Sequence, residues 1–219
     1  MEELTLFTYC RSSAAYRVRI ALNVKGINYQ SEFIHLLKDG GQEKTEYYSQ
    51  INPQQLIPSL LADGDVITQS MAIIEYIDEV YPIPALLPDN PIDRSYVRSI
   101  AQTIACDIHP LNNLRVLEYL EKKLSVETAE KNKWYCHWIN LGFSALEERL
   151  KKSGKSGKYC FENQITMADI CLVPQVYNAL RFNCDPKKYT LIYNIYQNCM
   201  KSAVFINASP EKQKDFVVS

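Results

Sequence analysis

The fold is decided by residues 4–26, which read LTLFTYCRSSAAYRVRIALNVKG. The run Leu4–Tyr9 is rich in residues that favour strands, and the residues after it place apolar side chains at helical spacing. Ser12-Ser13 stands at the predicted helix start, and Gly26 is a typical helix end because glycine readily adopts a left-handed conformation. A second strand-like run, residues 29–34, follows at once. The stretch therefore predicts strand, turn, helix and strand, with the two strands parallel.

A β-hairpin and a further helix are predicted to follow. Ser59–Ala62 and Val66–Thr68 are short apolar runs on either side of Asp63-Gly64-Asp65, a turn-forming triplet. Ser70 then precedes a helical pattern and is expected to cap that helix with its hydroxyl. Residues 1–81 are therefore predicted to form an α/β domain with the element order β-α-β-α-β-β-α.

The second part of the chain is predicted to be helical. Residues 82–91 are the only proline-dense segment, and we place a linker there because proline blocks helix continuation. Residues 92–219 are predicted to form an all-α domain, because apolar residues recur at three- and four-residue intervals. The expected helices are 92–124, 128–152, 167–181 and 189–200. The polar tail, residues 209–215, is expected to be loosely held.

Composition excludes several classes of function. The 24 basic and 25 acidic residues nearly cancel and form no basic block, so a nucleic-acid partner is not expected. The amino terminus is acidic, unlike a secretory signal, and no apolar run approaches the length of a membrane span. The seven cysteines are scattered without a C-x-x-C pair, which argues against a disulfide framework and a zinc site. We expect a protein of the reducing cytoplasm, without membrane contact and without a bound metal.

Three turns carry residues suited to a polar ligand. Ser12-Ser13 is either a simple cap or a hydroxyl placed at the positive end of a helix dipole. Ile57-Pro58 is either an ordinary turn or a cis peptide that leaves the Ile57 backbone at the open sheet edge. Gln69-Ser70 either caps the next helix or binds a carboxylate. All three are expected at one end of a small open sheet, where such folds bind ligands.

These motifs resemble those of the cytosolic glutathione transferases, and most closely those of their zeta class. The similarity extends over nearly the whole chain and is carried by residues 11–22, 52–58, 69–76 and 166–175. It implies a thioredoxin-like α/β amino-terminal domain, an all-α carboxyl-terminal domain, and a homodimer. Thr166 and Asp169 have the spacing of a capping box, so we interpret this pair as structural.

The resemblance implies roles for individual residues. Ser12 is expected to hydrogen-bond the glutathione sulfur, and Ser13 and Arg11 complete the predicted catalytic set. The hydroxyl and the helix dipole would together favour the thiolate. Contacts to glutathione are expected from Ser12, Ser13, Arg17, Gln42, Glu43, Ile57, Pro58, Gln69, Ser70, His109 and Asn113. The carboxylates of a second substrate are expected to bind Arg11, Arg115 and Arg181.

The sequence also departs from the zeta pattern. The signature usually contains a cysteine and a further serine, and Ala14 and Ala15 stand there instead. The chemistry is therefore expected to depend on Ser12. Glu43 occupies a position where the family usually has a glutamine. Considered without the resemblance, Arg17 would be interpreted as part of a solvated helix face.

The implied function is glutathione-dependent conversion of maleylacetoacetate, a small dicarboxylate, to fumarylacetoacetate in tyrosine and phenylalanine breakdown. Maleylpyruvate isomerisation and a general transferase or dehalogenase activity on small electrophiles are alternatives. Residues 10–13 also form a C-x-x-S motif, which leaves open a thiol–disulfide oxidoreductase with Cys10 as the reactive thiol. A non-enzymatic binding module is a further alternative, because a fold alone does not fix activity.

Overall fold

The computed structural model describes residues 4–217, which form two compact units. Unit 1 runs to Ala85 and also includes the chain from Ser202 onward, and unit 2 is Leu86–Lys201. The sequence pattern assigns residues 92–219 to one helical domain, so the two divisions differ in the last helical segment. Helical periodicity records local structure, and it does not tell which part of the chain a short helix packs against.

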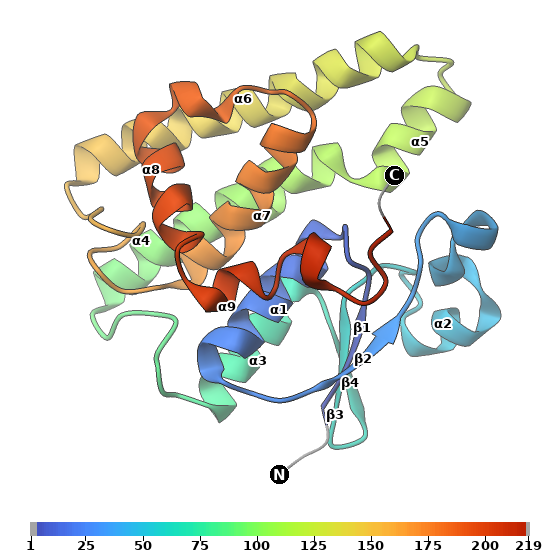
Figure 1. Ribbon diagram of the computed structural model, residues 1–219, viewed down its shortest axis with the longest axis horizontal. Helices are drawn as coiled ribbons and strands as arrows, with labels where there is room; N and C mark the ends of the chain where they lie inside the picture. The colour runs from blue at the N-terminus through green and yellow to red at the C-terminus, as the bar shows by residue number, and fades with distance from the viewer. Residues whose placement is uncertain (1–3, 218–219) are drawn as a thin grey trace. The chain divides into compact units, whose positions relative to one another are not determined.

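Unit 1 is built on a four-stranded mixed sheet (Figure 1). Its strands are β1 (Thr5–Thr8), β2 (Gln30–Phe33), β3 (Ser59–Ala62) and β4 (Asp65–Thr68), in the order β2-β1-β3-β4. β1 pairs parallel with β2 and antiparallel with β3, and β3 pairs antiparallel with β4. The predicted parallel unit and the predicted hairpin are therefore confirmed.

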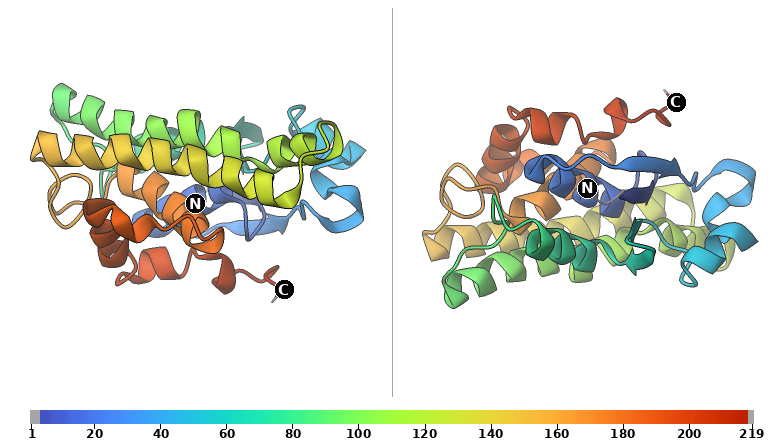
Figure 2. Two further views of the ribbon diagram at one scale, coloured as in Figure 1. Left: turned by 90° about the horizontal axis from the view of Figure 1, so that it is seen from above. Right: turned by 90° about the horizontal axis from the view of Figure 1, so that it is seen from below.

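The helices of unit 1 are α1 (Ser13–Lys25), α2 (Glu46–Ile51), α3 (Ser70–Val80) and α9 (Ala203–Ile206). α1 ends at Gly26, whose left-handed φ of 66° confirms the predicted helix end. Figures 1 and 2 show α1 between α3 and the final segment of the chain. This position explains why α1 buries every residue from Ala15 to Leu22, including Arg17 and Arg19.

Side chains of α1 hold the final segment by donating hydrogen bonds to the backbone carbonyls of that segment. The Asn23 side chain donates to the Val204 carbonyl at 3.0 Å, and Arg19 Nε donates to the Ala208 carbonyl at 2.9 Å. Further along, Gln213 Nε2 donates to the Ser209 carbonyl at 2.9 Å. The prediction of a loosely held tail over residues 209–215 is therefore wrong. Polar composition indicated exposure, but here the polar groups bind backbone atoms of unit 1.

Unit 2 is helical, which confirms the predicted fold class. Its helices are α4 (Pro91–Gln102), α5 (Leu114–Lys122), α6 (Thr128–Ser153), α7 (Met167–Arg181) and α8 (Thr190–Cys199). Figure 2 shows α6 running alongside α4. The single helix predicted over 92–124 is wrong, because a π-helical turn (Thr103–Ile108) and a 3₁₀ turn (His109–Asn112) separate α4 from α5. Pro110 lies at this interruption and has no amide hydrogen to continue a helix.

α7 begins with the predicted capping box. Asp169 Oδ2 accepts from the Thr166 amide at 2.8 Å, and Asp169 Oδ1 accepts from the Cys160 amide at 2.8 Å. Burial raises the pKa of Asp169, and the hydrogen bonds from Cys160 and Thr166 oppose that shift. The structural interpretation of Thr166 and Asp169 is therefore confirmed.

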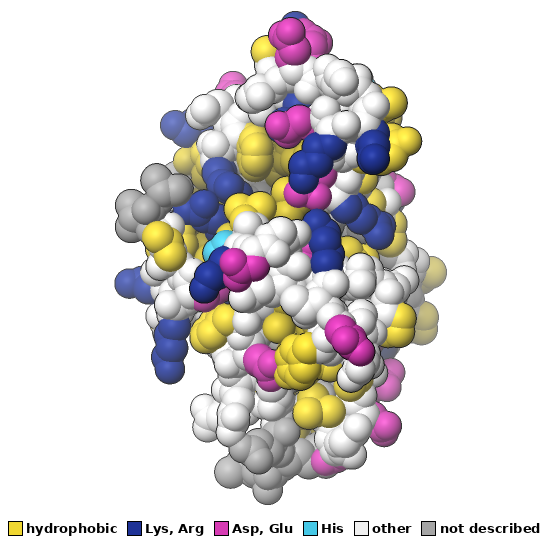
Figure 3. All heavy atoms as spheres, turned by 90° about the vertical axis from the view of Figure 1, so that its right-hand side faces the viewer, with side chains coloured by type: hydrophobic (Ala, Val, Ile, Leu, Met, Phe, Trp, Pro, Cys, Tyr) yellow, Lys and Arg dark blue, Asp and Glu magenta, His cyan; other side chains and the backbone are white. Residues whose placement is uncertain are grey.

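The surface mixes charges of both signs. On the face that Figure 3 shows, basic side chains are interspersed with acidic ones, in keeping with the formal net charge of −1. From residue 4 to residue 217, no helix combines the length and apolar character needed to cross a membrane. Over the same residues, no three His, Cys, Asp or Glu side chains form a group that could hold a metal ion.

A disulfide joins two cysteines of unit 2. Cys136 of α6 is bonded to Cys184, which follows α7, and their Cα atoms are 5.0 Å apart. The sequence-based argument against disulfides is therefore wrong for this pair. The two residues are 48 positions apart, and only the packing of α6 beside the end of α7 brings them together. Spacing rules for cysteines detect local motifs and could not have found it.

We predict that replacing both Cys136 and Cys184 with serine lowers the free energy of unfolding by about 2–4 kcal/mol, because the bond restricts the unfolded chain. Urea denaturation without reductant measures the change, and dithiothreitol should lower the wild-type midpoint to that of the double variant. Cys106→Ser, at an exposed free thiol, is the control and should not change the midpoint. An unaltered wild-type midpoint in dithiothreitol would contradict the prediction.

Candidate active site

Strand pairing brings three turns to one end of the sheet. Phe7 of β1 and Thr68 of β4 both pair with Ser59, the first residue of β3, so β1 and β4 end where β3 begins. The turns at this end carry Arg11-Ser12-Ser13, Ile57-Pro58 and Gln69-Ser70. The structure therefore brings together, in unit 1, the three turns that the sequence singled out.

Ser12 caps α1 and still has a hydrogen to donate. Its backbone is extended, with φ −76° and ψ 116°, and its Oγ accepts a hydrogen bond from the Ala15 amide at 3.2 Å. A hydroxyl that accepts in this way keeps its own O–H as a donor. Ser12 is partly exposed and Ser13 is buried, both at the positive end of a 13-residue helix. The capping role and a ligand-binding role are therefore compatible.

Arg19 holds the turn that leads to Ser12. This side chain is fully buried, and its Nη1 donates to the Tyr9 carbonyl at 3.2 Å while its Nη2 donates to the Cys10 carbonyl at 2.9 Å. Burial lowers the pKa of Arg19 to about 10, so the guanidinium is still charged at neutral pH. A buried charge that donates several hydrogen bonds fixes the backbone it contacts.

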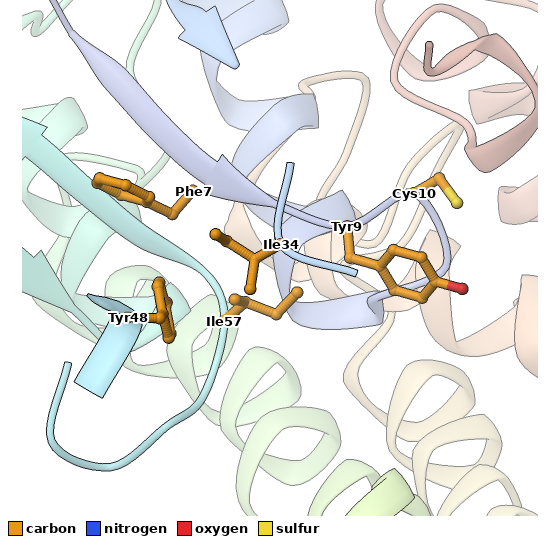
Figure 4. Close-up of a cluster of buried hydrophobic side chains, with 6 residues drawn as sticks. All are labelled: Phe7, Tyr9, Cys10, Ile34, Tyr48 and Ile57. Atoms are coloured by element: carbon orange, nitrogen blue, oxygen red, sulfur yellow. The ribbon is translucent and has the colours of Figure 1, made fainter. Parts of the chain in front are cut away.

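Ile57-Pro58 is a cis peptide, as the sequence argument allowed. The residue before it is clamped, because the Leu56 carbonyl accepts from the Tyr48 hydroxyl at 2.8 Å and from Asn52 Nδ2 at 2.7 Å. Figure 4 shows Ile57 grouped with Phe7, Ile34 and Tyr48 in a buried cluster. Among residues 4–217, neither the amide nor the carbonyl of Ile57 has a hydrogen-bond partner. These two groups are therefore available to pair with the backbone of a peptide ligand.

Gln69 and Ser70 begin α3 without a side-chain cap. The predicted capping role of Ser70 is wrong, because the cap position is Gln69, which has a left-handed φ of 71° and makes no capping bond. Ser70 Oγ instead accepts from Arg17 Nη1 at 3.3 Å. Arg17 is 2% exposed, so its interpretation as a solvated helix residue is also wrong. Gln69 Nε2 donates to Gln54 Oε1 at 2.8 Å, which ties this turn to the loop before β3.

Gln42 and Glu43 differ in what they offer to a ligand. Gln42 Oε1 accepts a hydrogen bond from the His35 amide at 2.8 Å, so the side-chain oxygen already stabilises the loop between these two residues. Glu43 is 6% exposed, and its Oε2 is buried with no hydrogen-bond partner among the described residues. A buried carboxylate oxygen in this state is an acceptor for an N–H or ammonium donor.

The remaining predicted site residues lie in unit 2. His109 begins the 3₁₀ turn before α5, and Asn113 caps α5 by accepting from the Arg115 amide at 3.1 Å. Arg115 is exposed on the first turn of that helix. Arg181, the last residue of α7, is also exposed, and its Cζ lies 5.2 Å from the centre of the Phe182 ring.

Tyr135 links these two regions of unit 2. Its ring stacks on Phe182 with centroids 3.9 Å apart, and its backbone carbonyl accepts from Asn112 Nδ2 at 3.0 Å. Burial raises the pKa of Tyr135, and the nearby charge of Arg181 partly opposes the shift. Phe182, which follows Arg181, is thereby packed against the helix that carries Tyr135.

Sequence reasoning missed the supporting residues Arg19, Tyr48 and Tyr135. An arginine among the apolar positions of α1 could have indicated a buried donor, because such a charge needs partners. Nothing in the local sequence distinguishes Tyr48 or Tyr135 from the other tyrosines, because their partners come from distant segments.

Cys10 lacks the properties of a reactive thiol. It is 2% exposed, and its Sγ donates to the Asp215 carbonyl at 3.7 Å. Burial, together with the charge of Asp215, raises the pKa of Cys10 to about 11. Since the thiolate is the nucleophilic form of cysteine, this environment argues against the thiol–disulfide oxidoreductase alternative.

A thioredoxin-like sheet with a cis proline before β3, a serine at the start of α1 and a helical second unit define a protein of the glutathione S-transferase class. The sequence profile of the glutathione S-transferase amino-terminal domain matches residues 2–79. The chain is 48% identical to a probable maleylacetoacetate isomerase of Vibrio cholerae, covering 98% of this chain and 99% of that protein. It is 42% identical to a maleylpyruvate isomerase of Ralstonia, covering 97% and 99%.

Solved structures agree with this assignment. The holo structure of a maleylpyruvate isomerase, described as a bacterial zeta-class glutathione S-transferase, matches with a TM-score of 0.94 and 42% identity, covering 97% of this chain and 100% of that one. A maleylacetoacetate isomerase of Methylobacterium extorquens with bound malonate and glutathione matches with a TM-score of 0.93 and 32% identity, covering 98% and 100%. The chain therefore belongs to the zeta class of the glutathione S-transferases.

We predict that iodoacetamide labels Cys106 and leaves Cys10 unlabelled in the native protein at neutral pH. With a pKa of about 11, only about one Cys10 thiol in ten thousand is ionised at neutral pH. Peptide mass spectrometry measures the labelling, and denaturation should expose Cys10 to the reagent. Cys106→Ser, the matched control, should leave the native protein unlabelled. Labelling of native Cys10 as fast as Cys106 would restore the oxidoreductase alternative.

Proposed function

We propose that this protein is a glutathione-dependent isomerase that converts maleylacetoacetate, a cis dicarboxylate, into its trans isomer fumarylacetoacetate. The observation that carries the proposal is the geometry of Ser12, which caps α1 and keeps an O–H donor at the positive end of that helix. Full-length similarity to proteins named as isomerases of this kind supports the choice of reaction.

The residues of unit 1 fit a bound glutathione. The unpaired amide and carbonyl of Ile57 suit main-chain pairing with the cysteinyl unit of the tripeptide. Ser70 at the amino end of α3, with the buried charge of Arg17 beside it, suits the γ-glutamyl carboxylate. Glu43 Oε2 supplies an acceptor for an N–H group. Ser13, Gln42, Pro58, Gln69, His109 and Asn113 complete the proposed contact set, which rests on the family resemblance.

When bound, glutathione supplies the thiolate that adds to the cis double bond and leaves again. Ser12 donates its O–H to the sulfur, and the helix dipole of α1 adds positive potential at the same place. Both effects lower the thiol pKa from its ordinary value of about 8.5 and so increase the reactive fraction at neutral pH. No side chain has to act as a strong base in this scheme.

Three arginines are proposed to bind the substrate's negative charges. Arg11 lies beside Ser12, and Arg115 and Arg181 belong to unit 2. The planar guanidinium forms paired hydrogen bonds with a carboxylate. It also stabilises the negative charge that develops on a substrate oxygen during the reaction. A neutral electrophile would gain nothing from these groups, which favours a dianionic substrate over general conjugation.

Maleylpyruvate is the second candidate substrate. It requires the same chemistry on a shorter dicarboxylate, and the relative at 42% identity is named for it.

We further propose that the enzyme acts as a cytoplasmic homodimer in the breakdown of tyrosine and phenylalanine. In a reducing cytoplasm, ambient thiols would favour the reduced dithiol form of Cys136 and Cys184 over the disulfide.

We predict that the purified protein isomerises maleylacetoacetate, or maleylpyruvate, only when glutathione is present. The loss of absorbance of the cis enol measures the rate, and comparison of the two substrates identifies the preferred one. Glutathione is not consumed, so its concentration should be unchanged after many turnovers. Isomerisation without glutathione, or turnover of a conjugation substrate alone, would contradict the proposed function.

The same assay distinguishes the role of Ser12 from that of Ser13. Ser12→Ala should reduce kcat by about 100-fold or more, because it removes a hydrogen-bond donor to the developing charge. Ser13→Ala is the matched control and should reduce it by a much smaller factor. Equal losses in the two variants would show that Ser12 has been assigned the wrong role.

A further inference from the structure

The last described residues of the chain contact the turn that carries Arg11 and Ser12. Asp215 Oδ2 accepts a hydrogen bond from the Cys10 amide at 2.8 Å. The Val217 carbonyl accepts from Arg11 Nη2 at 3.1 Å. The ring of Phe216 lies under the same guanidinium, with 5.3 Å between the ring centre and Arg11 Cζ. These contacts join residues more than 200 positions apart in the sequence.

Asp215 completes the support of this turn. Arg19 binds the carbonyls of Tyr9 and Cys10, and Asp215 binds the Cys10 amide, so donors and acceptors of the same short segment are held from two sides. Asp215 Oδ1 is buried and has no hydrogen-bond partner within residues 4–217. Asp215 is partly buried, and a hydrogen bond from an amide to a carboxylate is stronger when it is shielded from water than when it is exposed.

Phe216 and Val217 both contact the Arg11 side chain. Phe216 packs against the buried cluster that contains Tyr9 and Cys10, and Figure 4 shows these two side chains at one end of that cluster. The phenyl ring therefore provides a fixed surface for the guanidinium. A free arginine side chain loses considerable rotational freedom when it binds a carboxylate. An arginine that is already oriented loses less and binds more tightly.

We propose that Asp215–Val217 are positioning residues of the active site, with separate effects on its two ligands. Asp215 keeps the Ser12 turn in the geometry that binds glutathione, and Phe216 and Val217 orient Arg11 for a substrate carboxylate. The second part rests on the proposed function of Arg11. Phe216 is thereby a specificity-determining residue, since it affects charged second substrates and leaves glutathione binding unaffected.

Titration calorimetry with two probes tests the proposal. The first probe is glutathione alone, and the second is malonate, an unreactive dicarboxylate, added to protein saturated with glutathione. Phe216→Leu keeps an apolar side chain of similar volume and removes the ring. The variant should bind malonate about two- to fivefold more weakly, the size of effect that one cation–π contact can account for. Its affinity for glutathione should be unchanged. Asp215→Ala should weaken glutathione, and Asp215→Asn should restore most of the affinity because its amide oxygen still accepts from Cys10.

Lys214→Ala is the matched control, an exposed residue of the same segment, and should change neither affinity. Equal malonate affinity in Phe216→Leu and wild type, or equal weakening of both probes, would overturn the role of Phe216. Equal behaviour of Asp215→Ala and Asp215→Asn would overturn the role of Asp215. Wild type that binds malonate without isomerising either substrate contradicts the proposed function and leaves this inference standing. Wild type that binds no malonate overturns the carboxylate part of the inference itself.

Discussion

In the proposed mechanism one hydroxyl, that of Ser12, has to stabilise the first turn of α1 and bind the ligand at the same time. The Ala15 amide occupies an acceptor position of Ser12 Oγ and leaves the hydroxyl hydrogen free to be donated, in the proposed mechanism to the sulfur of glutathione. This double use works only if the turn before α1 is held in one conformation. Arg19 inside α1 and Asp215 near the end of the chain both bind the Cys10 backbone, so we infer that the proposed chemistry at Ser12 depends on contacts from two distant parts of unit 1.

The amino-acid sequence predicted most of the fold because the relevant signals are local. Strand-like runs, the end of α1 at Gly26 and the capping box at Thr166 each depend on neighbouring residues. The three turns of the candidate site were found in the same way, since each follows or precedes a strand. Their meeting at one end of the sheet then follows from the pairing of Phe7 and Thr68 with Ser59.

Three of the errors, those on the disulfide, on Arg17 and on the tail, share a physical cause, which is that the decisive partner lies far away in the sequence. Cys136 and Cys184 meet only after α6 and α7 pack, and Arg17 lies buried on α1, where its hydrogen-bond partner Ser70 comes from α3. The sequence predicts a loosely held tail because the tail's hydrogen-bond partners, such as the Cys10 amide, belong to the first residues of unit 1. The polar groups of the candidate site are thus supported in part by residues, such as Tyr48 and Asp215, whose own local sequence gives no indication of that role.

The most direct measurement of the central claim is the titration of the thiol of bound glutathione, followed by the ultraviolet absorbance of the thiolate. In the wild-type protein the midpoint should lie well below the ordinary thiol pKa of about 8.5. In Ser12→Ala the midpoint should rise by about one unit or more, because one hydrogen bond to the charged form is lost. The same midpoint in both proteins would contradict the account, since Ser12 would then not stabilise the thiolate.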